Sequence, residues 1–216
     1  MKSSKPLILT LLFCFIFPLI AFADTFEEAE LAIEKGEFKK AHELLAPLAD
    51  NGNLDAKTLI NSITFDEAVL EIAKNNFEKA HELLAPLADN GNLDAKTLIG
   101  SMYFKGQGVE KDVNKGLSII MSAAAKGSEQ ARALAAAMNK ELAALGDVKA
   151  MYNIGYMCLN NWGGPVNPYT CLKWLENAAD EGHKKSAKVL VQIYKEGKFG
   201  VTPDNVKASE WSEKAR

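Results

Sequence analysis

Residues 38–60 read FKKAHELLAPLADNGNLDAKTLI, and residues 77–99 read FEKAHELLAPLADNGNLDAKTLI. The two stretches agree at 22 of 23 positions, with Lys39 against Glu78 as the one difference, and they lie 39 residues apart. The agreement extends to 29 of 39 positions when residues 26–64 are compared with residues 65–103. Packing constrains the apolar positions of a repeat but not its outward polar ones, so the near-identity indicates a recent internal duplication. A duplicated unit of this length predicts a repeat architecture.

The spacing of apolar residues predicts that each unit is helical. Phe38, Ala41, Leu44, Leu45 and Leu48 recur at intervals of three and four, which is the period of an amphipathic helix. No stretch shows the sustained alternation that is typical of a strand. We therefore expect an all-α chain of antiparallel helix pairs, with helices of about 12 to 16 residues. The pairs are expected to stack into an α-solenoid, because one pair cannot bury its own apolar face.

Glycines and capping residues mark the expected ends and starts of the helices. Glycine can adopt positive φ and is favoured where a helix stops. Four glycines fall at such places: Gly52, Gly91, Gly127 and Gly182. Asn167-Pro168 and Thr202-Pro203 are typical of helix starts, since each combines a capping side chain with proline at the first helical position.

A longer pattern becomes recognisable from Ala95, where the chain reads AKTLIGSMYFKGQGVEKDVNKG, and related stretches begin at Ala150 and Ser186. The pattern resembles the Sel-1-like repeat, a relative of the tetratricopeptide repeat with a longer, glycine-containing loop between its two helices. That loop is missing from 54–75 and 128–145. Each of these two segments is therefore expected to form one long or kinked helix.

The repeat pattern also predicts how neighbouring helices meet. Small residues, among them Ala95, Gly100 and Gly155, are expected to let helices approach closely. Aromatic residues at core spacing are expected to fill the space between layers: Tyr103, Tyr194, Trp174 and Trp211.

The first 23 residues have the pattern of an export signal. Lys2 and Lys5 precede an apolar run from Leu7 to Phe22, and Ala21-Phe22-Ala23 supplies the small residues that a signal peptidase recognises. The alternative is a retained membrane anchor, but the run is interrupted by proline and is shorter than the roughly 20 residues that span a bilayer. We expect cleavage after Ala23, a bacterial periplasmic or secreted location, and no stable membrane anchor. Residues 24–216 are expected to form a single domain of about five repeats.

Composition argues against a nucleic-acid partner. The chain has 25 Lys+Arg against 28 Asp+Glu, and two of the basic residues are arginine. Loss of the two lysines in residues 1–23 leaves 23 basic residues and a net charge of −5. Nucleic-acid binding needs a basic surface that this balance does not supply, so no nucleic-acid partner is expected.

No catalytic, cofactor or metal site is evident in the sequence. His42-Glu43 and His81-Glu82 begin as a zinc-protease motif would, but alanine stands four residues after each histidine, so we interpret both histidines as solvated helix positions. His183 has no evident partner. Gly106-Gln107-Gly108 belongs to the repeat loop and lacks both a third glycine and a preceding strand. We therefore expect a protein that is not an enzyme.

Certain cysteine-rich relatives of the repeat family are associated with penicillin binding or hydrolysis, which is an alternative function. A serine enzyme of that class needs Ser-x-x-Lys and Lys-Thr-Gly. None of the serines after residue 23 has lysine three positions later, and Lys57-Thr58 and Lys96-Thr97 are followed by leucine. A metal-dependent enzyme that hydrolyses penicillins is not expected either, because the chain has only three histidines to hold the metal.

Two cysteines remain after signal cleavage, Cys158 and Cys171. In register with the repeat from Ala95, Cys158 falls at the position of Tyr103 and Cys171 at that of Gly116. These positions lie near adjoining ends of two antiparallel helices. In an exported protein the pair is expected to form a disulfide, with two buried thiols as the alternative.

By resemblance to related helical repeats, the first helix of each pair lines a concave surface that binds a protein or peptide. The candidate groove residues are Thr97, Ser101, Tyr152, Tyr156, Asn160, Lys188, Gln192 and Lys195. Tyr152 and Tyr156 lie four apart and share a helix face, where they act either as binding hot spots or as packing residues. The function expected is that of an adaptor in an envelope process, with a secreted factor acting on host proteins and the penicillin-related enzyme as alternatives.

Overall fold

The computed structural model describes residues 25–162 and 167–216. Throughout these residues the regular elements are helices, and no strand occurs among them. Residues 25–34 are helical. The helices that follow are α2 (Phe38–Asp50), α3 (Leu54–Ala73), α4 (Phe77–Asp89), α5 (Leu93–Lys105), α6 (Val113–Ala125), α7 (Glu129–Ala144), α8 (Val148–Leu159), α9 (Pro168–Asp180), α10 (Lys184–Glu196), the 3-10 turn η1 (Lys198–Gly200) and α11 (Asn205–Lys214). The prediction of an all-α repeat fold is confirmed.

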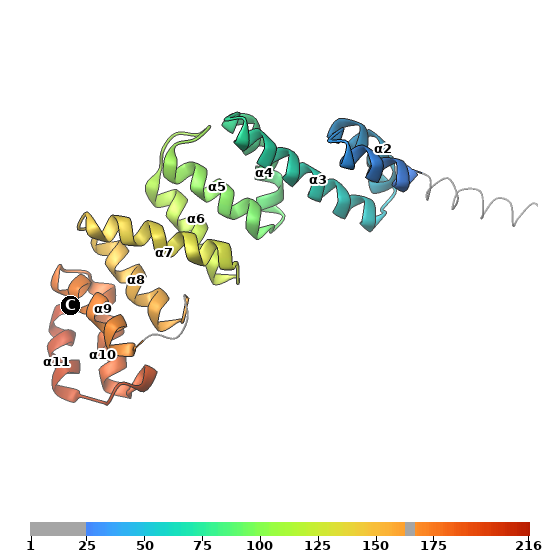
Figure 1. Ribbon diagram of the computed structural model, residues 1–216. Coiled ribbons are helices and arrows are strands. Elements are labelled where there is room, and N and C mark those ends of the chain that lie inside the picture. The colour runs from blue at the N-terminus through green and yellow to red at the C-terminus, as the bar shows by residue number, and fades with distance from the viewer. Residues whose placement is uncertain (1–24, 163–166) are drawn as a thin grey trace, which may run out of the picture. The chain divides into compact units, whose positions relative to one another are not determined.

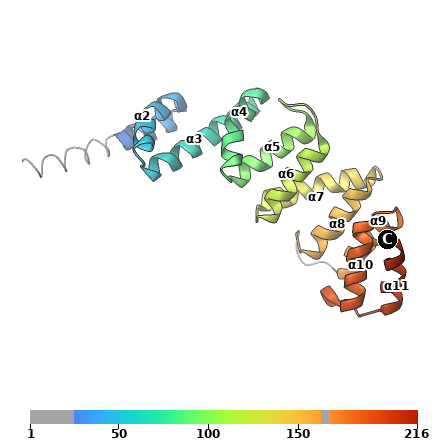
Figure 2. The same ribbon diagram turned by 180° about the vertical axis from the view of Figure 1, so that it is seen from behind.

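The described residues form two compact units. One contains the residues up to Asn90 together with Gln107–Val109, and the other contains Gly91–Gly106 and Glu110–Arg216. Within each unit, helices that follow one another in the chain pack side by side, as Figure 1 and the view from behind in Figure 2 show. This arrangement is that of stacked antiparallel helix pairs.

The first unit repeats its contacts as well as its sequence. Lys40 Nζ lies 2.9 Å from Glu28 Oε1, and 39 residues later Lys79 Nζ lies 2.8 Å from Glu67 Oε1. The helix α3 crosses the boundary between the two copies, because its second half corresponds to residues 26–34. The first copy of the unit therefore ends inside a continuous helix rather than in a loop, and α3 runs for 20 residues.

A buried acidic residue distinguishes the second copy from the first. Glu71 stands where the first copy has Ala32, and its carboxylate accepts hydrogen bonds from Asn76 Nδ2 at 2.7 Å and Lys74 Nζ at 3.2 Å. Lys79 Nζ lies 3.6 Å from the same carboxylate. The hydrogen bonds from Asn76 and Lys74 lower the pKa of Glu71 below its usual value. The charge is therefore compensated where it is buried.

The two long helices predicted from the missing glycine loops are confirmed. The first is α3, and the second is α7, a helix of 16 residues. Both are continuous helices, which removes the alternative of a break at the position of the usual loop. On α7 the buried Asn139 accepts a hydrogen bond from Asn153 Nδ2 of α8 at 2.9 Å, so a polar contact fixes these two helices within the apolar core.

The second unit places glycine where its helices cross most closely. A Cβ atom on Gly116 of α6 would lie 2.5 Å from the carbonyl oxygen of Gly100 and 2.6 Å from the amide nitrogen of Phe104, both on α5. On α8, a Cβ atom on Gly155 would lie 2.7 Å from Leu175 Cγ of α9. The expectation of small residues at close crossings is therefore confirmed for Gly100 and Gly155.

The apolar core of the second unit lies between successive helices. Around α6 and α7 it contains Leu117, Ile120, Ala123, Ala124, Ala131, Ala135, Met138 and Met157. Around α9 and α10 it contains Leu172, Leu175, Leu190, Ile193 and Tyr194 among others. Of the four aromatic residues expected between layers, Tyr194 is buried and donates a hydrogen bond to Glu176 Oε1 at 2.8 Å. Tyr103, Trp174 and Trp211 are half-buried.

The helix ends agree with the sequence signals at all but one place. Gly52, Gly91, Gly127 and Gly182 have φ values of 88°, 95°, 104° and 86°, which confirms them as stops. Asn167 caps α9 by accepting a hydrogen bond from the amide of Tyr169 at 3.0 Å.

The helix start predicted at Thr202-Pro203 is wrong. The helix α11 begins at Asn205, and its cap is Asp204, which accepts from the amides of Val206 and Lys207 at 3.0 Å each. Pro203 lies against Gly197, and the amide of Asp204 donates to the carbonyl of Tyr194 at 2.7 Å. These tertiary contacts hold the segment outside the helix, which therefore starts two residues later than the dipeptide suggests.

None of the helices in the described part of the chain combines the length and apolar character required to cross a membrane. The export signal predicted for residues 1–23 lies outside the described residues.

Candidate partner-binding surface

The eight predicted groove residues all belong to the second unit, on or next to α5, α8 and α10. Five of them are exposed: Tyr156, Asn160, Lys188, Gln192 and Lys195. Ser101 is half-buried. Thr97 and Tyr152 are buried, with 6% and 8% of their surface exposed. The exposed candidates therefore lie on α8 and α10.

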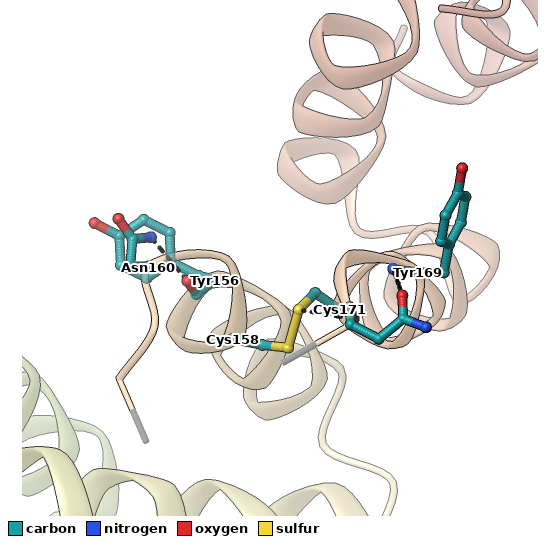
Figure 3. Close-up of a disulfide and its surroundings, with 6 residues drawn as sticks. Tyr156, Cys158, Asn160, Tyr169 and Cys171 are labelled. Carbon is teal, nitrogen blue, oxygen red and sulfur yellow. Dashed lines mark hydrogen bonds between the residues drawn. A yellow bond between two sulfur atoms is a disulfide. The ribbon is translucent and has the colours of Figure 1, made fainter. Parts of the chain in front are cut away.

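Two of the candidates make contacts that serve their own helix. The hydroxyl of Thr97 donates to the carbonyl oxygen of Leu93 at 2.7 Å, so this side chain offers little to a partner. Asn160 Nδ2 donates to the carbonyl oxygen of Tyr156 at 2.8 Å and so completes the last turn of α8 (Figure 3). Tyr156 is 39% exposed and is the exposed aromatic residue on this face of α8.

Four rings form a continuous series along α8, which we call the aromatic row: Trp162, Tyr156, Tyr152 and His183. The ring centroids of Trp162 and Tyr156 lie 5.8 Å apart, and those of Tyr156 and Tyr152 lie 6.2 Å apart. The rings of Tyr152 and His183 follow at 4.9 Å. These separations are in the range of favourable aromatic contacts. The row joins the C-terminal end of α8 to the start of α10.

The expectation that His183 has no partner is wrong. Its Nδ1 atom lies 2.8 Å from the hydroxyl of Ser186 and accepts from the Ser186 amide at 3.2 Å, so His183 is the N-cap of α10. Sequence reasoning also missed Trp162. The position of His183 directly after a helix-ending glycine could have indicated a capping role, because residues that accept a hydrogen bond are favoured there.

Cations flank the aromatic row at both ends. Lys185 Nζ lies 5.0 Å from the ring centroid of Tyr152, and the guanidinium carbon of Arg132 lies 5.7 Å from that of Trp162. Burial lowers the pKa of His183 below its usual value, and the positive charges of Lys185 and Lys149 lower it further. The neutral imidazole that results is the form that can cap α10.

We expect the protein to become less stable as the pH falls from 7 to 5, in part through His183. Its pKa in the folded state is below the unfolded value of 6.5, so the unfolded state binds the proton more readily. The stabilisation is complete above pH 6.5 and is lost as the pH falls through the folded pKa. Thermal unfolding at several pH values should show a smaller decrease for His183→Asn, because asparagine also caps a helix but does not titrate in this range. An unchanged pH dependence in that variant would contradict the assignment.

A disulfide between Cys158 and Cys171 joins α8 to α9, with Cα atoms 5.4 Å apart (Figure 3). It is the pairing expected from the repeat register. Cys171 is buried and Cys158 is half-buried. The bond lies between Tyr156 and Asn160 on one side and Tyr169 on the other, as Figure 3 shows. It therefore links the helix that carries Tyr156 to the next helix of the stack.

The histidines that resembled a zinc-protease motif have structural contacts instead. His42 Nε2 lies 3.0 Å from the hydroxyl of Thr64, and His42 is half-buried, so this position is partly solvated and also makes a contact with α3. His81 is half-buried as well. Within residues 25–162 and 167–216 no three residues of the metal-binding types are grouped so as to hold an ion.

Comparisons with known proteins place the fold in a family. A family model described as Sel1 repeat matches residues 71–92, 93–128, 148–183 and 192–216, more than half of the chain. No curated protein matches the sequence. Among solved structures, c5321, a protective antigen present in uropathogenic Escherichia coli strains and displaying an SLR fold, has 19% identity and a TM-score of 0.37. That match covers 82% of this chain and 41% of the other, so this chain spans less than half the length of that relative.

A second solved structure, a Sel1 repeat protein from Oxalobacter formigenes, has 22% identity to this chain and a TM-score of 0.36. The match covers 70% of this chain and 67% of that one. Both TM-scores are low, so neither solved structure supports the family assignment, whereas the family model matches more than half of the chain. This chain belongs to the Sel1 repeat family.

Proposed function

We propose that the protein is an exported scaffold of the bacterial envelope that binds a protein or peptide through α8 and α10. Sel1 repeats are non-catalytic helical scaffolds that generally mediate protein interactions. We choose this surface because Tyr156 is an exposed aromatic side chain and its ring packs within the aromatic row. Tyrosine is enriched at binding hot spots because it buries a large area and still offers a hydroxyl group.

Two features support the exported location. The signal pattern of residues 1–23 is one, and the disulfide between Cys158 and Cys171 is the other, because disulfides persist in oxidising compartments such as the periplasm. Intact-mass measurement of the protein recovered from the producing bacterium should show a mature chain beginning at Asp24. Recovery of a cytoplasmic chain that still carries Met1–Ala23 would refute export.

The binding surface is tested by a matched pair of tyrosine variants. A partner is first isolated by cross-linking and capture from an envelope fraction, identified by mass spectrometry, and purified. We expect Tyr156→Ala to weaken its binding by about 2 kcal/mol, because the side chain is exposed before binding and buried after it. Isothermal titration calorimetry gives the affinity, and circular dichroism should show an unchanged fold.

The control is Tyr169→Ala. Tyr169 is 54% exposed and lies on α9, on the other side of the disulfide from Tyr156 (Figure 3). It should bind the partner as well as the parent protein does. Equal losses in the two variants, or no loss in Tyr156→Ala, would place the binding surface elsewhere.

A further inference from the structure

The helices that carry the candidate surface have a strongly one-sided charge. Together α8 and α10 contain five lysines and a single acidic residue, Glu196. The lysines are Lys149, Lys184, Lys185, Lys188 and Lys195. The whole chain has more acidic than basic residues. A concentration of lysines on two helices of an acidic protein creates a local positive field that attracts acidic groups.

Most of these lysines have no ion-pair partner among the described residues. Glu196 forms its ion pair with Lys198, at 2.8 Å. Lys184 Nζ donates to the carbonyl oxygen of Arg216. In the part of the chain that the structure describes, no ion pair involves Lys149, Lys185, Lys188 or Lys195. Some lysines of the described residues do form ion pairs, as Lys214 does with Asp180 of α9.

Several of these lysines also occupy positions that do not favour the helix. Lys184 and Lys185 begin α10, and Lys149 is the second residue of α8. The N-terminal end of a helix carries a partial positive charge, so acidic residues are favoured there and lysines are not. Neither helix has an acidic residue in its first turn. At α8 the N-cap Asp147 offsets this effect, because its carboxylate accepts from the amide of Ala150 at 2.7 Å. At α10 the cap is His183, and nothing acidic offsets Lys184 and Lys185 in the first turn. A local arrangement of this kind, which does not serve stability, is expected at a functional surface.

The charged and aromatic groups lie together. Lys185 extends over the ring of Tyr152, and both Lys185 and Lys149 lie close enough to His183 for their charges to act on its imidazole. Tyr156 is the next ring along the aromatic row and is exposed. A ligand on this face therefore meets ammonium groups beside an aromatic surface. Carboxylates would pair with the ammonium groups, and an apolar side chain would pack against the aromatic surface.

We propose that this surface binds an acidic peptide segment of the partner, with carboxylates facing Lys149, Lys185 and Lys188 and an apolar side chain against Tyr156. The proposal rests on the proposed function and specifies the chemistry of the partner. A peptide fits better than nucleic acid, because the chain has only two arginines and Arg132 is paired with Glu129.

The test uses the mature chain and a short fluorescein-labelled peptide in which glutamate alternates with leucine. The matched probe has glutamine in place of glutamate. Fluorescence anisotropy should show binding of the glutamate peptide that weakens as salt is added, and no comparable binding of the glutamine peptide. Equal binding of the two probes would overturn the proposal.

Charge reversal locates the site. Lys185→Glu with Lys188→Glu should weaken binding of the glutamate peptide by about tenfold. The control is Lys140→Glu with Lys173→Glu, which makes the same change in net charge at exposed positions on α7 and α9 and should leave binding unchanged. If the glutamate variants do not fold by circular dichroism, the pair Lys185→Gln and Lys188→Gln replaces them. If the variant and its control lose the same affinity for the glutamate peptide, the effect depends on net charge alone, and the proposed site is wrong.

Other anionic ligands and the proposed function are separated by further measurements. Strong binding of phosphatidylglycerol vesicles or duplex DNA without binding of the peptide would overturn the acidic-peptide proposal. If the captured envelope partner depends on Tyr156 but not on Lys185 and Lys188, the scaffold function stands and the acidic chemistry is wrong. If the glutamate peptide binds at these lysines but no envelope partner is captured, the chemistry stands and the envelope role fails.

Discussion

Replacing Gly116 with alanine is expected to lower the free energy of unfolding by about 3 kcal/mol or more. The new Cβ atom would lie within 3.0 Å of three backbone atoms of α5: the carbonyl oxygen of Gly100 and the amide nitrogen and Cα of Phe104. Backbone atoms of a packed helix cannot move without displacing the whole helix. Alanine is favoured over glycine within a helix by about 1 kcal/mol, which is too little to offset this overlap.

Urea denaturation followed by circular dichroism measures this effect, and Gly155→Ala is its matched control. At Gly155 the new Cβ atom would meet the side chain of Leu175 at 2.7 Å and the carbonyl oxygen of Cys171 at 3.2 Å. A side chain can change its rotamer, so the loss should be clearly smaller than at Gly116. A Gly116→Ala protein as stable as the parent would show that α5 and α6 do not cross this closely.

Removing the disulfide is expected to lower the free energy of unfolding by about 3 kcal/mol. Cys158 and Cys171 are 13 residues apart in sequence. A bond between them closes a short loop, which restricts the unfolded chain more than the folded one. The variant that replaces both cysteines with serine should therefore unfold at a lower urea concentration than the parent, with the transition of the parent moving toward it when reductant is added.

Two measurements check this interpretation. The mature protein, purified without reductant and then denatured, should contain no titratable thiol. Reductant should leave the unfolding of the double serine variant unchanged, because that protein has no bond to lose. Two reactive thiols in the parent would mean that the cysteines are buried but unbonded, and the loss of stability in the serine variant would then reflect packing alone.

The sequence determined much of the fold of this protein because helices depend on local interactions. The three-to-four spacing around Phe38 and the glycines at Gly52 and Gly91 act within a few residues of one another. Such signals specify where helices form and stop. The duplication also predicts that two stretches fold alike. In agreement, the ion pair Lys40–Glu28 of the first copy recurs as Lys79–Glu67 in the second. The Sel1 repeat pattern from Ala95 was recognisable for the same reason.

The candidate surface was only partly predictable from the sequence. Tyr156, Lys188 and Lys195 are exposed as the repeat pattern suggests. Tyr152 lies four residues before Tyr156 and on the same face of α8. It is nevertheless buried, because His183 of the following helix pair covers its ring. The helix period gives the direction of a side chain but not what stands opposite it.

Tertiary structure alone decided several contacts that no local pattern of residues indicates. It placed His183 on Tyr152, set Trp162 beside Tyr156, and moved the start of α11 from Pro203 to Asn205 through contacts with Gly197 and Tyr194. Each of these depends on the distance and angle at which helices cross. That geometry results from the packing of many side chains at once, and no short stretch of sequence contains it.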